Sequence, residues 1–142
     1  MAGAGNRPLS PHLQIWRWGP AMLVSILHRV TGTALAIGGL GLLLWWLGAL
    51  ASGPDAYATF TGWTFHPGDG ASQLQVAVSV LVRLAMVGLT WAFWQHLASG
   101  VRHFFLDVGA GYELEANARM SVATIIVSVL LTIFTWVLII RL

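Results

Sequence analysis

Three apolar stretches constrain the fold of this chain more than any other feature of its sequence. They cover about residues 21–50, 74–106 and 121–142. Because a hydrocarbon core about 30 Å thick is crossed by about 20 helical residues, each stretch is long enough to span a bilayer. In lipid the backbone must satisfy its own hydrogen bonds, as a helix does. We therefore predict an all-α membrane protein with three transmembrane helices in a single domain, residues 1–142.

The charged residues are few, and the basic ones are of one kind. Only 8% of the 142 residues are charged, against about 25% in soluble domains, which supports a membrane protein. All seven basic residues are arginines, scattered along the chain. Nucleic-acid binding needs a clustered basic face, so no nucleic-acid partner is expected. The chain has no cysteine, which excludes thiolate-ligated iron–sulfur clusters and covalently attached c-type haem.

The arginines predict how the chain crosses the membrane. Residues 1–20 form a polar arm that lacks the apolar core of a signal peptide, and its prolines and glycines oppose a continuous helix. Arginines gather on the arm side of the first stretch and around the connection between the second and third stretches. These are Arg7, Arg17, Arg29, Arg102 and Arg119. Because cytoplasmic loops are enriched in Arg and Lys, we expect the N-terminus in the cytoplasm and the C-terminus on the opposite side.

The connections between the stretches are rich in turn-forming residues. Residues 51–72 contain SGPD and HPGDG and are predicted to form a loop. Residues 109–118 are predicted to form a polar connector. Arg83 interrupts the second stretch about 20 Å of helix rise before His96, so its head group is expected to extend to the outer lipid headgroups.

Four ionisable side chains lie at the end of the second stretch, within HLASGVRHFFLDVG (96–109). They are His96, Arg102, His103 and Asp107. An Arg or Asp at the bilayer centre costs about 2.5–3.5 kcal/mol on insertion scales, so such residues suggest a functional site. Spacings of seven and four residues place His96, His103 and Asp107 on one helix face.

A second polar group, Ser25, His28 and Arg29, lies at the start of the first stretch. Ser25 and Arg29 are four residues apart and share a helix face. With the predicted orientation, both polar groups lie in the cytoplasmic half of the membrane. We therefore predict that they meet in the folded protein, around a haem and a quinone.

Each haem role has a structural alternative. A neutral imidazole is the usual axial ligand of haem iron, so His96 is a candidate ligand; otherwise it is a packing histidine bonded to a backbone or hydroxyl group. Arg102 and His103 can donate charged hydrogen bonds to haem propionates, and Asp107 can orient one of them or deliver protons. From periodicity alone, an interfacial charge cluster that anchors the helix end explains these last three residues more simply.

A quinone site is the candidate role of the other polar group. A quinone carbonyl needs hydrogen-bond donors while it gains electrons and protons, and Ser25 with a nearby Arg29 can supply them. The alternative is a polar first turn in which Ser25 caps the helix and Arg29 extends to the headgroups, and the residues alone favour it. His12 and His66 lie in polar segments and are expected to be surface residues.

Two motifs resemble signatures of the cytochrome b membrane-anchor subunit of succinate dehydrogenase, the larger of the two small anchors of respiratory complex II. The first, RPLSPHLQIWRWGPAMLVSILHRVTG, has Arg-Pro followed by a spaced Ser-x-x-His-Arg-x-Thr-Gly. The second, HLASGVRHFFLDVG, has His, three residues, Gly, an aliphatic residue, Arg-His, and then Asp and Gly. With the three-span plan, the resemblance covers nearly the whole chain.

The resemblance implies a haem b shared between two chains. It makes His96 the axial ligand of the haem iron, with the other axial ligand contributed by a second anchor subunit that packs against this one in a haem-binding helical bundle. His28, Arg29 and His103 match positions near the haem propionates, and Arg102 is a further candidate there.

The resemblance also implies a quinone site and a set of partners. Ser25 and Arg29 match quinone-site residues, and Asp107 matches an acidic residue near that site. Electrons from succinate would leave a flavoprotein subunit, cross an iron–sulfur subunit and reduce ubiquinone here, linking the tricarboxylic acid cycle to electron transport. The expected location is a bacterial inner membrane, as a multi-pass protein in contact with lipid, in preference to the mitochondrial inner membrane.

Three other functions fit parts of the sequence. A fumarate-reductase anchor would run the reaction in reverse with menaquinone, but the motifs match the succinate dehydrogenase branch better. A pure docking anchor would bind a soluble enzyme without haem or quinone. A transporter subunit is disfavoured because its polar groups should extend through the membrane, whereas here, apart from Arg83, they gather at one end.

Overall fold

The computed structural model describes residues 10–141. Residues 1–9 of the predicted arm, with Arg7, and Leu142 at the end of the third predicted span lie outside this range. Within it the chain is helical and contains no strand. The elements in chain order are α1 (His12–Ile15), α2 (Pro20–Ala34), a π-helical segment (Leu35–Gly39), α3 (Leu40–Ala51), α4 (Pro54–Thr64), α5 (Gln73–Asp107) and α6 (Leu114–Arg141).

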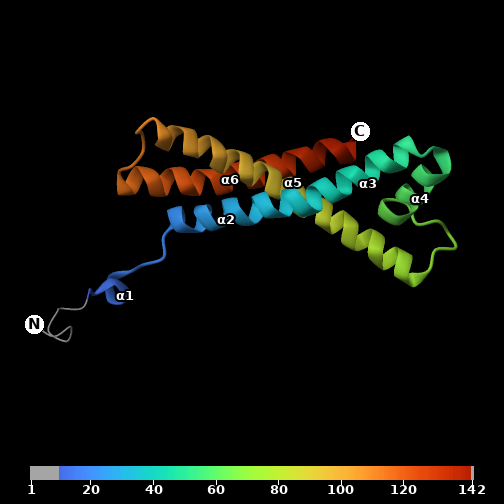
Figure 1. The fold of residues 1–142 in the computed structure, drawn as a ribbon, viewed down its shortest axis with the longest axis horizontal. Coiled ribbons are helices and arrows are strands. Elements are labelled where there is room, and N and C mark those ends of the chain that lie inside the picture. Colours follow the sequence, from blue (N-terminus) through green and yellow to red (C-terminus); the bar gives the residue numbers. More distant parts are fainter. Residues whose placement is uncertain (1–9, 142) are drawn as a thin grey trace, which may run out of the picture.

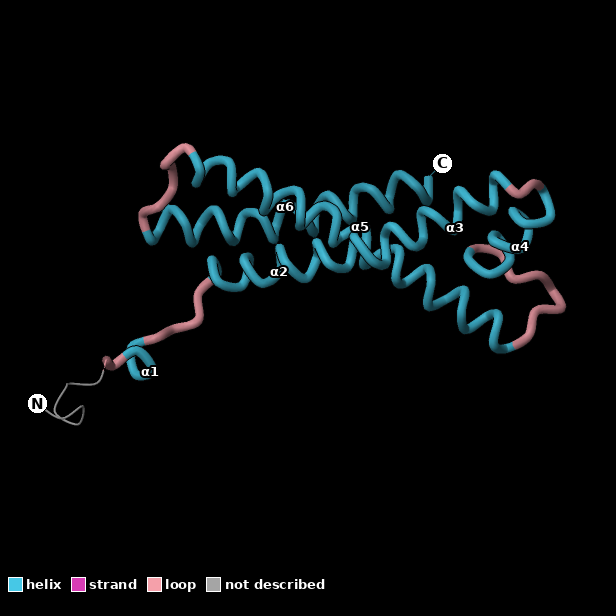
Figure 2. Tube along the Cα trace, viewed as in Figure 1, coloured by secondary structure: helices cyan, strands magenta, loops and turns pink. Residues whose placement is uncertain are grey.

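Three helices in the described range are long and apolar enough to cross a membrane, so the predicted fold class is confirmed. They are Pro20–Ala51, which joins α2 to α3, and the single helices α5 and α6. The long α5 crosses the bundle and packs against α2 and α6 (Figure 1). Residues 10–19 of the arm and the α5–α6 connection lie at one end, hereafter the arm end, and α4 lies at the other, the α4 end (Figure 2). The cytoplasmic placement of the arm stays a prediction.

A π-helical segment interrupts the first span, for which a continuous α-helix is expected. It covers Leu35–Gly39 and ends in two consecutive glycines. Glycine is a weak helix former, and wider π turns occur where a helix must adjust to a neighbour. A Cβ atom at Gly38 would lie 3.6 Å from Cδ2 of Leu89, so the segment lies directly against α5.

The loop predicted for residues 51–72 contains a helix, α4. Gly53 has a φ of 100°, a turn that glycine adopts without strain, and Pro54 follows at the first helical position. Phe60 is only 3% exposed, and its ring centroid lies 4.9 Å from that of Trp45. This aromatic contact packs α4 against α3. The turn-forming residues of the segment did not predict the helix.

The polar connector predicted for residues 109–118 is shorter than expected, because α6 begins at Leu114. Two glycines with positive φ, Gly109 (84°) and Gly111 (79°), close the turn. A Cβ at Gly111 would lie 2.7 Å from Sδ of Met120 and would displace that flexible side chain, and the positive φ itself favours glycine. The tight turn lets the first turns of α6 pack against the end of α5.

The bundle interior is small and polar, and its exterior is apolar. Among the described residues of α5 and α6, many of the buried side chains carry a hydroxyl group, and one carries an amide. These are Ser79, Gln95 and Ser99 on α5, and Ser121, Thr124, Ser128 and Thr132 on α6. Ser128 donates a 2.7 Å hydrogen bond to Oε1 of Gln95. Small residues allow close approach of helices in lipid, so this arrangement fits a membrane bundle.

Candidate functional site

The two predicted polar groups meet near the arm end, between α2 and α5. The imidazole rings of His28 and His96 are stacked, with centroids 4.0 Å apart and planes at 11°. The ring of His103 lies edge-on to His28, with centroids 5.3 Å apart. The prediction that these groups come together in the fold is therefore confirmed, and three histidines form one connected group.

The ring of His96 is oriented by α2. Its Nδ1 lies 3.0 Å from the backbone carbonyl oxygen of His28 and 3.3 Å from the hydroxyl of Thr31. A carbonyl oxygen only accepts, so Nδ1 carries the proton and donates. This tautomer leaves a lone pair on Nε2, for which the described residues supply no hydrogen-bond partner.

Gly32 makes this approach possible. A Cβ at position 32 would lie 2.8 Å from Cε1 of His96, closer than side-chain atoms tolerate. Glycine removes that obstacle and lets the Cε1 edge of the imidazole approach the backbone of α2. Thr31, beside it, is 1% exposed and donates a 2.7 Å hydrogen bond to the carbonyl of Leu27. Thr31 and Gly32 form the end of the first motif, but their contact with His96 is not predictable from the motif alone.

His28 is held by α5 in return. Its Nδ1 lies 2.7 Å from Oγ of Ser99, a fully buried hydroxyl. Oγ of Ser99 itself donates to backbone carbonyls of its own helix, at 2.7 Å to Gln95 and 3.0 Å to His96. Its hydrogen is thus committed, so Nδ1 of His28 is the donor in the contact. Thus α2 orients His96 of α5, and α5 orients His28 of α2.

Three other predicted site residues have side chains without a polar partner among residues 10–141. The side chain of Ser25 is half-buried, and those of Arg29 and Asp107 are exposed. Within residues 10–141 none of the three side chains makes a hydrogen bond or an ion pair. Their donor and acceptor atoms are free for a ligand or another chain. His12 and His66 are exposed, as expected for surface residues.

Arg102, which we predicted to join this group, is directed towards α6 instead. It is 6% exposed and donates a hydrogen bond to the side chain of Asn117. Arg83 is exposed, and its guanidinium donates to the carbonyl and hydroxyl oxygens of Ser79, both at 3.2 Å. Because Ser79 is one turn nearer to the start of α5, the head group of Arg83 extends towards the α4 end, the direction expected for it.

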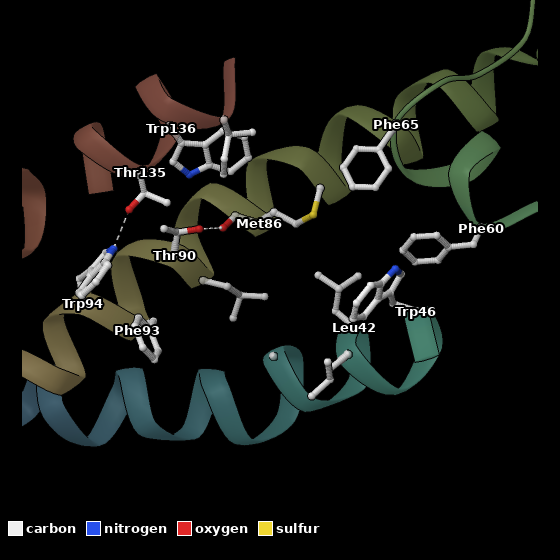
Figure 3. Close-up of a pocket in the computed structure, with 14 residues that line it drawn as sticks. Leu42, Trp46, Phe60, Phe65, Met86, Thr90, Phe93, Trp94, Thr135 and Trp136 are labelled. Carbon is white, nitrogen blue, oxygen red and sulfur yellow. Dashed lines mark hydrogen bonds between the residues drawn. The ribbon is translucent and has the colours of Figure 1, made fainter. Parts of the chain in front are cut away.

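A separate apolar cavity of about 660 Å³ lies towards the α4 end (Figure 3). Its walls include Trp46, Phe60 and Phe93, and no charged residue lines it. At one wall the indole of Trp94 donates a 3.0 Å hydrogen bond to the hydroxyl of Thr135. None of the predicted site residues borders this cavity.

The fold and site define a class: helical membrane proteins with three spans and an oriented intramembrane histidine group near one end. The chain belongs to the succinate dehydrogenase/fumarate reductase transmembrane subunit family, whose model matches residues 4–135. The family inferred from the two motifs, that of the cytochrome b anchor subunit of complex II, is thereby confirmed.

Curated relatives agree. The chain is 41% identical over 131 residues to the succinate dehydrogenase cytochrome b556 subunit of Paracoccus denitrificans, covering 92% of this chain and 90% of that one. It is 33% identical to the cytochrome b556 subunit of Rickettsia felis, covering 93% and 92%. It is also 33% identical to the mitochondrial cytochrome b560 subunit of Sus scrofa, covering 88% and 67%.

Proposed function

We propose that this chain is the haem- and quinone-binding anchor of a succinate:ubiquinone oxidoreductase. It shares one haem b with a second anchor subunit and docks the iron–sulfur and flavoprotein subunits to a bacterial inner membrane. It forms part of the site where ubiquinone receives electrons from the iron–sulfur subunit. The observation that carries the proposal is the orientation of His96, whose Nδ1–H is bonded to the carbonyl of His28 at 3.0 Å.

The residues around His96 fit a haem iron. Metal-ligating histidines almost always donate their other ring N–H to a carbonyl or carboxylate, which fixes the tautomer and makes the ligating nitrogen more basic. The carbonyl of His28 meets this condition, and Gly32 gives the ring its position. When bound, a haem supplies reversible one-electron transfer through its iron. In this proposal His96 would be the iron ligand from this chain, and the second anchor subunit would supply the other.

Two further histidines suit the haem propionates. The Nδ1 atom of His28 is used by Ser99, which leaves its second ring nitrogen for a ligand. His103 is exposed beside it and makes no hydrogen bond within residues 10–141. Imidazole groups donate charge-assisted hydrogen bonds to carboxylates when protonated. Arg29, one residue from His28 and exposed, extends this set of donors.

The quinone role rests on donors that the chain itself does not use. The hydroxyl of Ser25 and the guanidinium of Arg29 have no side-chain partner in the described range and lie on the same face of α2. A hydroxyl and a guanidinium held in place stabilise negative charge that develops on a quinone oxygen. Asp107, exposed at the end of α5, is the proposed acid that helps deliver protons.

The relatives favour succinate oxidation over the reverse reaction with menaquinone. The family model covers subunits of both succinate dehydrogenase and fumarate reductase. The bacterial and mitochondrial relatives above all bear the name succinate dehydrogenase. We therefore assign this chain the forward direction.

A reduced-minus-oxidised absorption spectrum of the purified complex tests the proposal. We expect the sharp α and β bands of a six-coordinate b-type haem with dithionite, and the same bands when succinate is the reductant. An intact complex with no haem signal would overturn the haem assignment and leave a docking anchor. A haem signal that fumarate oxidises readily but succinate does not reduce would overturn the assigned direction.

A further inference from the structure

A buried cation lies outside the histidine group, at the arm end between α5 and α6. Arg102 is 6% exposed, and its only hydrogen bond within residues 10–141 goes to the side chain of Asn117. Its Nε atom is buried and has no hydrogen-bond partner in that range. A guanidinium has five N–H donors and a permanent charge, so burying it without a counter-ion is costly.

The described chain supplies no counter-ion for Arg102. The one ion pair in residues 10–141 joins Glu115 to Arg119 at 3.5 Å, and both of its side chains are strongly exposed. Asp107 and Glu113, the other acidic residues at this end, are exposed and do not pair with Arg102. The missing charge therefore has to come from a group outside these residues.

An apolar groove begins beside the guanidinium. A cavity of about 290 Å³ lies between α5 and α6, and apart from Arg102 and Thr124 its lining is apolar. Its mouth is formed by Val101, Phe105 and Val127, which are 45%, 52% and 44% exposed on the outer surface of the helices. Its α5 wall extends from Ala98 to Phe105, about 10 Å of helix rise. The groove thus opens on the outer surface of this chain.

The position of Arg102 along α5 suits an interaction with a lipid headgroup. Arg102 lies about 8 Å of helix rise from the last residue of α5, Asp107. Because α5, at 35 residues, is longer than the roughly 20 residues that cross a hydrocarbon core, we infer that Arg102 lies near the headgroups. The first turns of α6 lie beside it, where a helix macrodipole favours negative charge. An anion with an attached hydrocarbon chain matches both parts, and basic pockets between membrane helices bind such headgroups.

We propose that this groove binds an anionic phospholipid from the leaflet at the arm end. The phosphate pairs with Arg102, including its otherwise unpartnered Nε–H, and one acyl chain fills the groove between α5 and α6. The histidine group uses α2 and the opposite side of α5, so this site does not rest on the proposed haem and quinone roles. The bound lipid would fill the groove between α5 and α6 that the chain's own side chains leave open.

Native mass spectrometry of the intact, delipidated complex tests the proposal. The probes are dioleoylphosphatidylglycerol, which is anionic, and dioleoylglycerol, which has the same chains but no phosphate and no charge. We expect the wild-type complex to bind the anionic lipid about tenfold more tightly, the gain typical of a charge-assisted hydrogen bond. Inorganic phosphate at millimolar concentration should not displace it, because phosphate lacks the chain. Displacement by phosphate would overturn a lipid site.

Three variants locate the site. Arg102→Gln should remove the preference for the anionic lipid, while Arg119→Gln, a change of equal charge on an exposed residue, should keep it. Ala123→Leu leaves the charge intact and fills the groove, so it should weaken anionic-lipid binding even if Arg102→Gln does not assemble. A wild-type complex without the preference would mean that a carboxylate of another subunit pairs with Arg102. That outcome overturns the proposal, as does an Ala123→Leu complex that binds normally.

Discussion

The two ends of this bundle are built differently. Near the arm end, ionisable side chains are packed between helices, and the other helix fixes each ring, as Thr31 and Ser99 do for the two stacked histidines. Towards the α4 end the helices separate around an apolar cavity of about 660 Å³ walled by aromatic rings, with no charged residue in its lining. Both regions lie within the same three spans.

The difference shows how a membrane protein can carry reactive groups. A polar side chain in hydrocarbon is tolerated where neighbouring helices satisfy it. The arm end meets this requirement largely with hydroxyls and carbonyls, and Nε2 of His96, where a ligand would bind, is left without a hydrogen-bond partner in residues 10–141. The α4 end relies on aromatic packing, as between Phe60 and Trp45.

Replacing His96 should have the largest effect of the changes proposed here, because it removes the ligand on which the arm-end site depends. We expect His96→Tyr to remove the low-spin b-type bands from the reduced spectrum, because the imidazole ligand is lost. The complex should still assemble, since the second anchor and the bundle contacts remain. Absorption spectroscopy of the purified variant measures this. An unchanged low-spin spectrum would rule out His96 as the axial ligand.

Gly32 should show that the position of the ring matters as well as its presence. A Cβ at Gly32 would lie 2.8 Å from His96 Cε1, so Gly32→Ala forces the imidazole to move. A ring displaced from its rotamer costs about 0.5–1.5 kcal/mol, which corresponds to about two- to tenfold weaker haem retention.

A glycine in the same span provides the control for that measurement. No atom lies within 4 Å of a Cβ placed at Gly41, in α3. Gly41→Ala should therefore retain haem like the wild type when both are assayed by haem content per complex after detergent washing. Equal retention by Gly32→Ala and Gly41→Ala would show that the contact with α2 does not position His96.

Ser25 should affect turnover but not haem. We expect Ser25→Ala to lower ubiquinone reduction by about tenfold through the loss of one hydrogen bond to a developing charge. Succinate oxidation with an artificial acceptor should survive, because the flavoprotein and iron–sulfur subunits are unaffected. The two activities are compared on one preparation. A parallel fall in both would indicate an assembly defect and remove Ser25 from the quinone site.

The sequence predicted which polar groups meet at the arm end better than it predicted how their side chains are arranged. Spacing along each stretch was enough to predict three spans and to place both polar groups at one end, where contact was expected. The close approach of His96 to Gly32 was not predictable, because it depends on how two helices cross. The direction of Arg102 was missed for a similar reason: its partner Asn117 belongs to a turn of α6 that composition assigned to a connector.

The helix α4 was missed because its stability is not local. Its segment has the glycine, proline and aspartate content of a loop, and the contact that holds it is made by Phe60 with Trp45 of a different helix. Patterns of length and polarity therefore predict which parts of a membrane protein lie in lipid. They do not predict how a connection folds back onto the spans.

Replacing Trp136 should have the smallest effect of these changes, and it tests most directly whether the two ends have separate roles. Its Nε1 atom is buried beside the apolar cavity and has no hydrogen-bond partner in residues 10–141. A buried unpaired N–H destabilises by about 1–3 kcal/mol, so Trp136→Phe removes a penalty along with some packing area. We expect the thermal midpoint of the complex to change by only a few degrees, and the haem spectrum and ubiquinone turnover to equal those of the wild type. A clear fall in turnover would show that the α4-end cavity takes part in quinone chemistry, so the division of labour between the two ends would no longer hold.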